Sequence, residues 1–145
     1  LDTVIERKLS LRVVTNASVI LTQHLTKLKH IADLDLQISI DGCQDSYDFM
    51  RFPNTWDTFT KNVSRLVAEL PRANVNFHIV VQPLNVQYLI PTLHWCNTQR
   101  VGTRITNLVV PEQVSWCILK PHEQVTCVDL LHNQLAQTQY QLILY

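Results

Sequence analysis

Glycine is scarce in this chain, since its 145 residues include 2. Loops that wrap a phosphate group need several glycines, because the backbone must come close to the ligand. No apolar run approaches the roughly 18 residues needed to cross a bilayer, and the first residues lack the basic-then-apolar order of a signal peptide. The sequence therefore predicts a soluble, cytoplasmic protein with no polyphosphate cradle and no membrane partner.

An excess of charge of one sign is also missing. Twelve Lys and Arg residues balance 12 Asp and Glu residues, which gives a formal net charge of zero and a pI near 7.2. Proteins that follow a nucleic-acid backbone normally carry a basic excess. We therefore expect no nucleic-acid partner.

The cysteines show neither a disulfide framework nor a metal-ligand spacing. They are widely spread in a chain long enough to have a core, so reduced thiols are expected. A set of Cys and His residues recurs at every fifth position, but residues five apart on a helix point about 140° apart. We predict no metal site from this set, which comprises Cys117, His122, Cys127 and His132.

What is present is an alternation of short β-branched runs with longer segments of helical period. The pattern predicts strands at 11–15, 36–40, 75–82 and 104–110, and helices before the first strand and at 21–32, 56–70, 85–99 and 121–139. The continuous apolar run 79–81 is typical of a strand buried on both faces. Gly42 is expected to reverse the backbone after the second strand, and Gly102 to cap the third helix.

Strands that alternate with helices indicate parallel βαβ units. A small doubly wound sheet and an arc of a (β/α) barrel both remain open at this stage, although a whole barrel needs at least about 200 residues. We predict an α/β fold, a partial (β/α) barrel arc of about four parallel strands with helices mainly on one face. In such an arc the inner face is expected to be apolar and uncovered, which would favour self-association.

Ligands of parallel α/β folds bind at the carboxyl ends of the strands. Neutral hydrogen-bonding residues with one carboxylate and one guanidinium follow the first three predicted strands, and Glu112 and Gln113 follow the fourth. Each has a structural alternative, such as a turn at Asp41, helix caps at Asn16 and Asn85, or a surface position for Arg51. The candidate binding residues are Thr15, Asn16, Ser39, Asp41, Arg51, Gln82 and Asn85.

The order of these motifs resembles the middle of the radical SAM enzyme family. The resemblance rests on Val14-Thr-Asn16, Ile38-Ser-Ile-Asp-Gly42, Tyr47-Asp-Phe-Met-Arg51 and Val80-Val-Gln-Pro-Leu-Asn85, and it covers roughly residues 10–100. Ala17 stands where the family usually has glycine. The stretch 111–121 more loosely resembles members with a twitch or SPASM-like extension.

The resemblance implies a partial barrel that binds S-adenosylmethionine and a [4Fe–4S] cluster. Reductive cleavage of the cosubstrate then yields a 5′-deoxyadenosyl radical that abstracts hydrogen from a small-molecule or peptide substrate, with a flavodoxin or ferredoxin as reductant. By this resemblance Ser39 and Arg51 would hold the methionine carboxylate and Asp41 would order the loop. Asn16 would help shape the pocket floor, and Gln82 and Asn85 would lie near the ribose.

The family's C-x₃-C-x₂-C cluster motif is missing, because no three cysteines here have that spacing. We therefore expect that this chain is an internal or C-terminal fragment whose cluster ligands precede Leu1, inactive by itself. Residues 1–120 would form the barrel segment and residues 121–145 a C-terminal helical extension. Two alternatives remain: a stand-alone, non-catalytic α/β binding or scaffold domain, and another barrel enzyme with Asp41 as acid or base.

Overall fold

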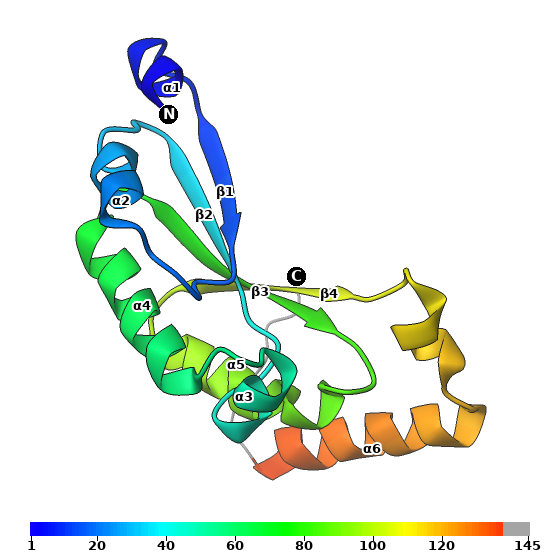
Figure 1. Ribbon diagram of the computed structural model, residues 1–145. Helices are drawn as coiled ribbons and strands as arrows, with labels where there is room; N and C mark the ends of the chain where they lie inside the picture. Colours follow the sequence, from blue (N-terminus) through cyan, green and yellow to red (C-terminus); the bar gives the residue numbers. More distant parts are fainter. Residues whose placement is uncertain (138–145) are drawn as a thin grey trace.

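The computed structural model describes residues 1–137, apart from the side chains of Gln113 and Cys117 (Figure 1). Four parallel strands pair in the order β1-β2-β3-β4, so that each strand neighbours the next one in sequence. The strands are β1 (Leu11–Thr15), β2 (Leu34–Ser39), β3 (Asn74–Val81) and β4 (Gly102–Asn107). All four lie where β-branched and alternating apolar residues predicted them.

The predicted helices are also present, and one further helix appears. The elements are α1 (Asp2–Glu6), α2 (Thr22–Leu28), α3 (Asp45–Met50), α4 (Trp56–Glu69), α5 (Leu89–Thr98) and α6 (Pro121–Gln137), with 3₁₀ turns η1 (Val86–Tyr88), η2 (Glu112–Val114) and η3 (Trp116–Ile118). The extra helix is α3, which occupies a segment expected to be a loop. Within residues 1–137 no helix is long and apolar enough to cross a membrane. The remainder of the predicted C-terminal extension lies outside the described residues.

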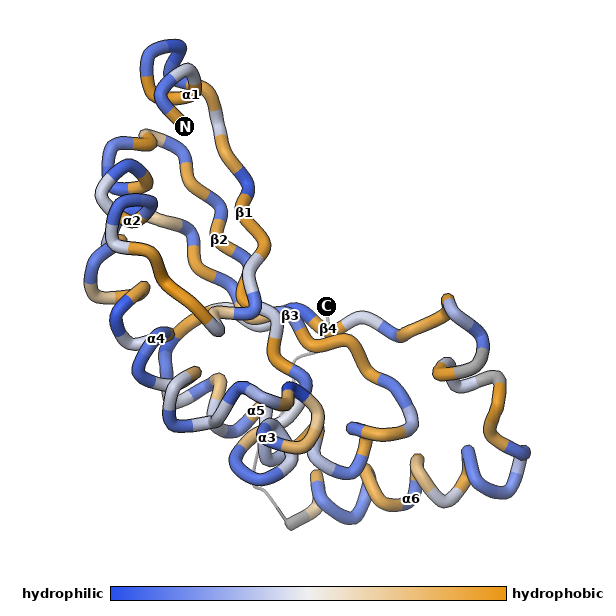
Figure 2. The backbone as a smooth tube through the Cα atoms, in the orientation of Figure 1, coloured by the Kyte–Doolittle hydropathy of each residue, from blue (hydrophilic) through white to orange (hydrophobic). Residues whose placement is uncertain are grey.

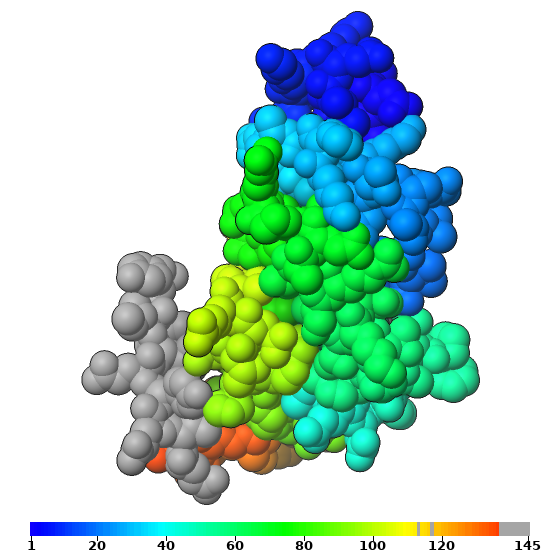
Figure 3. Space-filling view, turned by 90° about the vertical axis from the view of Figure 1, so that its left-hand side faces the viewer, coloured from blue at the N-terminus to red at the C-terminus, as the bar shows by residue number. Residues whose placement is uncertain are grey.

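The helices α2, α4 and α5 cover one face of the sheet, and no described helix covers the other (Figure 1). The helix α6 continues the same layer, since it packs against α5 and η1. Figure 3 shows α2 and α4 on this helical side. The predicted α/β fold, an arc of parallel strands with helices mainly on one face, is confirmed.

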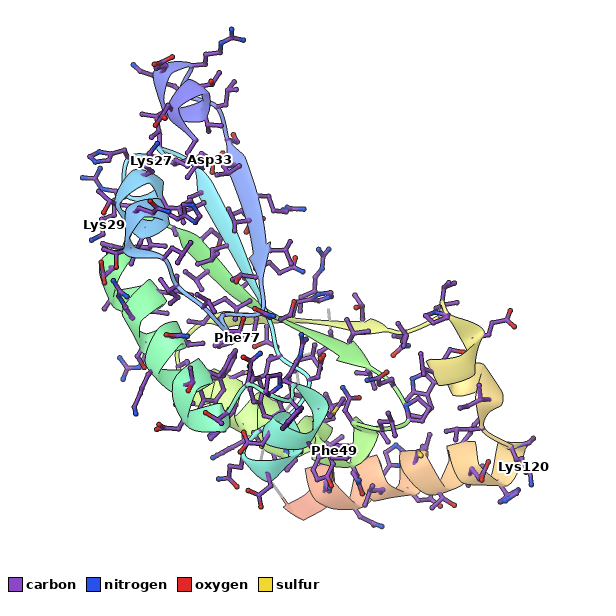
Figure 4. All side chains as sticks on the ribbon, in the orientation of Figure 1. Lys27, Lys29, Asp33, Phe49, Phe77 and Lys120 are labelled. Carbon is purple, nitrogen blue, oxygen red and sulfur yellow. The ribbon has the colours of Figure 1, made fainter. Side chains whose placement is uncertain are left out.

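The core lies between the sheet and the helical layer. Alternate residues of β2 and β3 are buried, which Figure 2 shows as alternating hydrophobic and hydrophilic positions along these strands. The buried strand residues Ile38 and Phe77 face the apolar stripe of α4, where Phe59 and Val63 are buried. Figure 4 shows Phe77 between the sheet and the helices.

The uncovered, concave face of the sheet is polar, so the expectation of an apolar face is wrong. The strand positions that alternate with the buried ones include Arg12, Asp35, Gln37 and His78, and their side chains are hydrogen-bonded across the strands. The prediction that 79–81 is buried on both faces is also wrong, because Val80 is half-buried on the concave face while its neighbours are buried. A polar face gives little hydrophobic drive for self-association.

Neither glycine has a positive φ, so what marks these positions is the close approach of a neighbouring side chain. A Cβ at Gly42 would lie 2.6 Å from Ser46 Oγ, and one at Gly102 would lie 2.5 Å from Asn76 Oδ1. Gly102 begins β4. The expectation that it caps α5 is therefore wrong. The left-handed residue after α5 is Arg100, with a φ of 56°.

Candidate functional site

The residues predicted to bind a ligand lie at one edge of the sheet, at or just beyond the carboxyl ends of β1, β2 and β3. Thr15 ends β1, Ser39 ends β2, and Gln82 follows β3. Because the three strands are parallel, these ends share an edge, below which α3 and η1 lie in Figure 1. The side chains at this rim nevertheless differ in what they contact.

Asp41 and Arg51 form an ion pair at the carboxyl end of β2. Arg51 Nη2 lies 2.5 Å from Asp41 Oδ2, and the two side chains are 24% and 17% exposed. The helix α3 brings Arg51 back to the strand end. The backbone N–H of Arg51 donates to the carbonyl of Tyr47 in the last turn of this helix. The guanidinium is thus held by its own loop, with part of its donor fork still available.

Two buried polar atoms beside this pair have no hydrogen-bond partner among the described residues. They are Arg51 Nε and the hydroxyl oxygen of Tyr47. Burial raises the pKa of the Tyr47 hydroxyl. The positive charge of Arg51 lowers this pKa in part, and the negative charges of Asp41 and Asp48 raise it further. An unpaired buried donor costs free energy unless something accepts its proton, so these two donors lack an acceptor among the described residues.

Thr15 and Asn16 are engaged in their own turn. Thr15 Oγ1 accepts from the N–H of Ala17 at 3.0 Å, and Asn16 Oδ1 accepts from the N–H of Ser18 at 3.1 Å. Ala17 is buried with a φ of 52°, a conformation that glycine adopts more readily. Asn62 of α4 donates to the carbonyl of Ala17 at 2.7 Å and fixes this turn to the helical layer.

Asn85 is also engaged internally. Its Oδ1 accepts from the N–H of Gln82 at 2.9 Å, and its Nδ2 donates to the carbonyl of Val80 at 2.9 Å. The side chain is 2% exposed. The structural alternative expected for Asn85 was a helix cap, but its side chain makes no cap hydrogen bond to η1 and instead bridges the backbone of Gln82 and Val80.

Ser39 differs from its neighbours at the rim. It pairs in register with His78 and belongs to the concave face, and its side chain makes no hydrogen bond within the described part of the chain. Glu112 lies in η2 beyond β4, and its carbonyl accepts from Ser115 Oγ at 3.0 Å. The candidate donors still free to meet a ligand are therefore Ser39, Gln82 and part of Arg51.

Sequence reasoning missed the hydrogen-bonded row on the concave face. Gln37 Nε2 lies 2.8 Å from His78 Nδ1, and His78 Nε2 lies 2.8 Å from Thr106 Oγ1. The sequence does carry a signal, since polar residues recur at alternate positions of three successive strands. That these residues face one another, however, follows only when the strand register is known.

A cavity of about 590 Å³ lies on the helical side, away from the rim. Its lining includes Cys43, Trp56, Pro91 and Trp95. These residues belong to the loop before α3 and to the outer parts of α4 and α5. None of the rim residues predicted from sequence lines it.

The described cysteines, Cys43, Cys96 and Cys127, are free thiols. Burial raises the pKa of Cys96 to about 12, and burial also raises the pKa of Cys43. Among the side chains that the structure describes, no three His, Cys, Asp or Glu residues come together in a way that would hold a metal ion.

These thiols should differ in reactivity between the folded and the unfolded chain. At pH 8 the native protein is expected to leave Cys96 unlabelled by iodoacetamide, because the thiolate is the nucleophile and its native pKa lies about three units above the ordinary value of 9.0. Peptide mass spectrometry after timed labelling would measure this, with the urea-unfolded chain as control. Equal labelling of Cys96 in both states would contradict the buried position of the Cys96 thiol on α5.

Comparison of the chain with protein-family models and with curated proteins found no match.

Proposed function

We propose that this chain is a segment of a radical SAM enzyme that carries part of the S-adenosylmethionine pocket. The observation that carries the proposal is the Asp41–Arg51 pair at the carboxyl rim, with a buried guanidinium nitrogen that lacks an acceptor within the described part of the chain. The arc of parallel strands with helices on one face supports it, since such an arc presents its strand ends to a ligand.

Part of the rim fits the methionine end of the cosubstrate. Arg51 Nε can donate to a carboxylate while Nη2 stays on Asp41, and a guanidinium is well shaped for such bonds. Ser39 offers a second donor. The side chains of Asn16 and Asn85 are occupied by their own turns, so they would shape the pocket walls without contacting the ribose through these groups.

The [4Fe–4S] cluster does not fit this chain, because its cysteines lack the required spacing and the described ones do not converge. The cluster ligands, the reductant and the remaining substrate contacts would have to come from outside it. When the cosubstrate is bound in an intact enzyme of this family, it supplies the 5′-deoxyadenosyl radical that abstracts hydrogen. The role of this chain would be to bind and orient the amino-acid end of the cosubstrate.

The stable analogue S-adenosylhomocysteine tests the proposal. Saturable NMR shifts at the backbone amides of Ser39 and Arg51 are expected on titration. An Arg51→Gln variant should bind at least about tenfold more weakly, because a hydrogen bond to a charged group is worth roughly 1.5–3 kcal/mol. The matched control is Arg7→Gln, at an exposed position beyond α1.

Circular dichroism would establish that the Arg51→Gln variant keeps its fold. Equal affinity of the two variants, or shifts confined to residues away from the rim, would contradict the proposal.

The second candidate is a stand-alone, non-catalytic α/β binding or scaffold domain. The observation in its favour is that most of the rim's polar groups already have partners within the chain, as Asn16, Asn85 and Asp41 do. A polar concave face also lets such a domain exist without a covering layer. Absence of any response to S-adenosylhomocysteine would favour this candidate.

A further inference from the structure

A directed row of hydrogen bonds crosses the concave face from β2 to β4. The amide nitrogen of Gln37 can donate but not accept, so His78 Nδ1 is the acceptor of their 2.8 Å bond. The ring proton of a neutral His78 then sits on Nε2, which donates to Thr106 Oγ1 at 2.8 Å. Thr106 accepts from the histidine, and its own hydroxyl proton is left to donate to something else.

Arg104 lies beside the end of this row. It precedes Thr106 by two residues on β4, which places both side chains on the same face of the strand. It also pairs in register with His78. Within residues 1–137 no ion pair involves Arg104, and its side chain is exposed.

The other arginine on this face is in a different state. Arg12 Nε lies 2.6 Å from Asp35 Oδ2, so its charge is compensated. Asn76 Nδ2 approaches the second oxygen of the same carboxylate at 3.5 Å. Of the two arginines on this face, Arg104 on β4 is the one without an ion-pair partner among residues 1–137.

We propose that Thr106 and Arg104 form an oxyanion site, which takes the carboxylate or phosphate group of a small polar molecule. The hydroxyl and the guanidinium both donate, and no described carboxylate opposes them. His78, held by Gln37, is a positioning residue, because it fixes the direction of the Thr106 proton. Anion binding stands by itself, whereas the role of this site as the anchor of an enzyme's substrate rests on the proposed function.

The test is a pair of NMR titrations, one with inorganic phosphate and one with malonate, on the chain at constant ionic strength. Saturable shifts are expected at the Thr106 and Arg104 amides and at the His78 ring. Arg104→Gln should weaken binding at least about tenfold and Thr106→Val several-fold. Arg12→Gln removes the same charge from the same face and should change the affinity less than twofold.

The tighter of the two titrations identifies the group that the site takes. If anion binding depended only on the overall charge of this face, Arg12→Gln and Arg104→Gln would weaken it equally. That result would overturn the proposal. Shifts that stay linear to tens of millimolar in both titrations would overturn it too. S-adenosylhomocysteine binding depends on Arg51 at the rim, so its failure with an intact anion response would remove the proposed function and leave this site standing.

Discussion

A Phe59→Ala variant is expected to lose about 3–5 kcal/mol of unfolding free energy, the range for removing a fully buried aromatic side chain. Phe59 is 1% exposed and stands at the centre of an aromatic cluster. Its ring centroid lies 4.6 Å from that of Tyr47, 5.5 Å from Trp56 and 5.9 Å from Trp95. The variant therefore leaves a cavity where α3, α4 and α5 meet. Urea denaturation followed by tryptophan fluorescence would measure the loss.

The chain contains a matched control for this measurement. Phe49 of α3 is 79% exposed and labelled in Figure 4. Phe49→Ala should change the unfolding free energy by no more than about 0.5 kcal/mol, as for other surface substitutions. Similar losses in the two variants would mean that α4 does not pack on the sheet as described.

The strands and the main helices were readable from local pattern because their apolar residues recur with the right period. The helix α4 is the clearest case, since it begins at the Thr55 cap, where Oγ1 accepts from the N–H of Thr58, and ends before Pro71. The helix α3 was missed because its six residues hold no full stripe. Tyr47 is buried by Trp56 and Phe59, which belong to another helix, so its helical state depends on tertiary contacts.

The rim of the candidate site could be placed from sequence, but the partners of its side chains could not. Parallel strands put Ser39, Gln82 and Asn16 at one edge whatever their roles. Whether an asparagine faces a ligand or its own turn depends on backbone geometry a few residues away, which local pattern does not specify. The polar concave face required the strand register, because Gln37, His78 and Thr106 are 41 and 28 residues apart in sequence.

The Asp41–Arg51 pair joins two elements of the fold, and the proposed pocket depends on it. The ion pair runs through Arg51 Nη2, which lies 2.5 Å from Asp41 Oδ2, and the N–H of Nε takes no part in it. It fixes the end of β2 to the end of α3 and leaves Nε buried without an acceptor among the described residues. A rim built for stability alone would be expected to satisfy that nitrogen.

Asn85→Ala is expected to lower the unfolding free energy by about 2–6 kcal/mol, because it leaves two part-buried backbone groups without partners at about 1–3 kcal/mol each. The last ladder bond here runs from the N–H of Ile40 to the carbonyl of His78, so β2 offers no donor to Val80 and the side chain of Asn85 supplies it. Asn97→Ala, at an exposed position of α5, should cost no more than about 0.5 kcal/mol.

Urea denaturation measures both losses of stability. The affinity of the folded Asn85→Ala variant for S-adenosylhomocysteine then separates the two roles considered for Asn85, a turn contact and a ribose contact. A residue that shapes the turn alone should leave that affinity within about threefold in the folded protein, whereas a direct ribose contact would weaken it by tenfold or more without the loss of stability. Loss of affinity at unchanged stability would show that the buried bridge between Gln82 and Val80 is not what holds this end of the sheet.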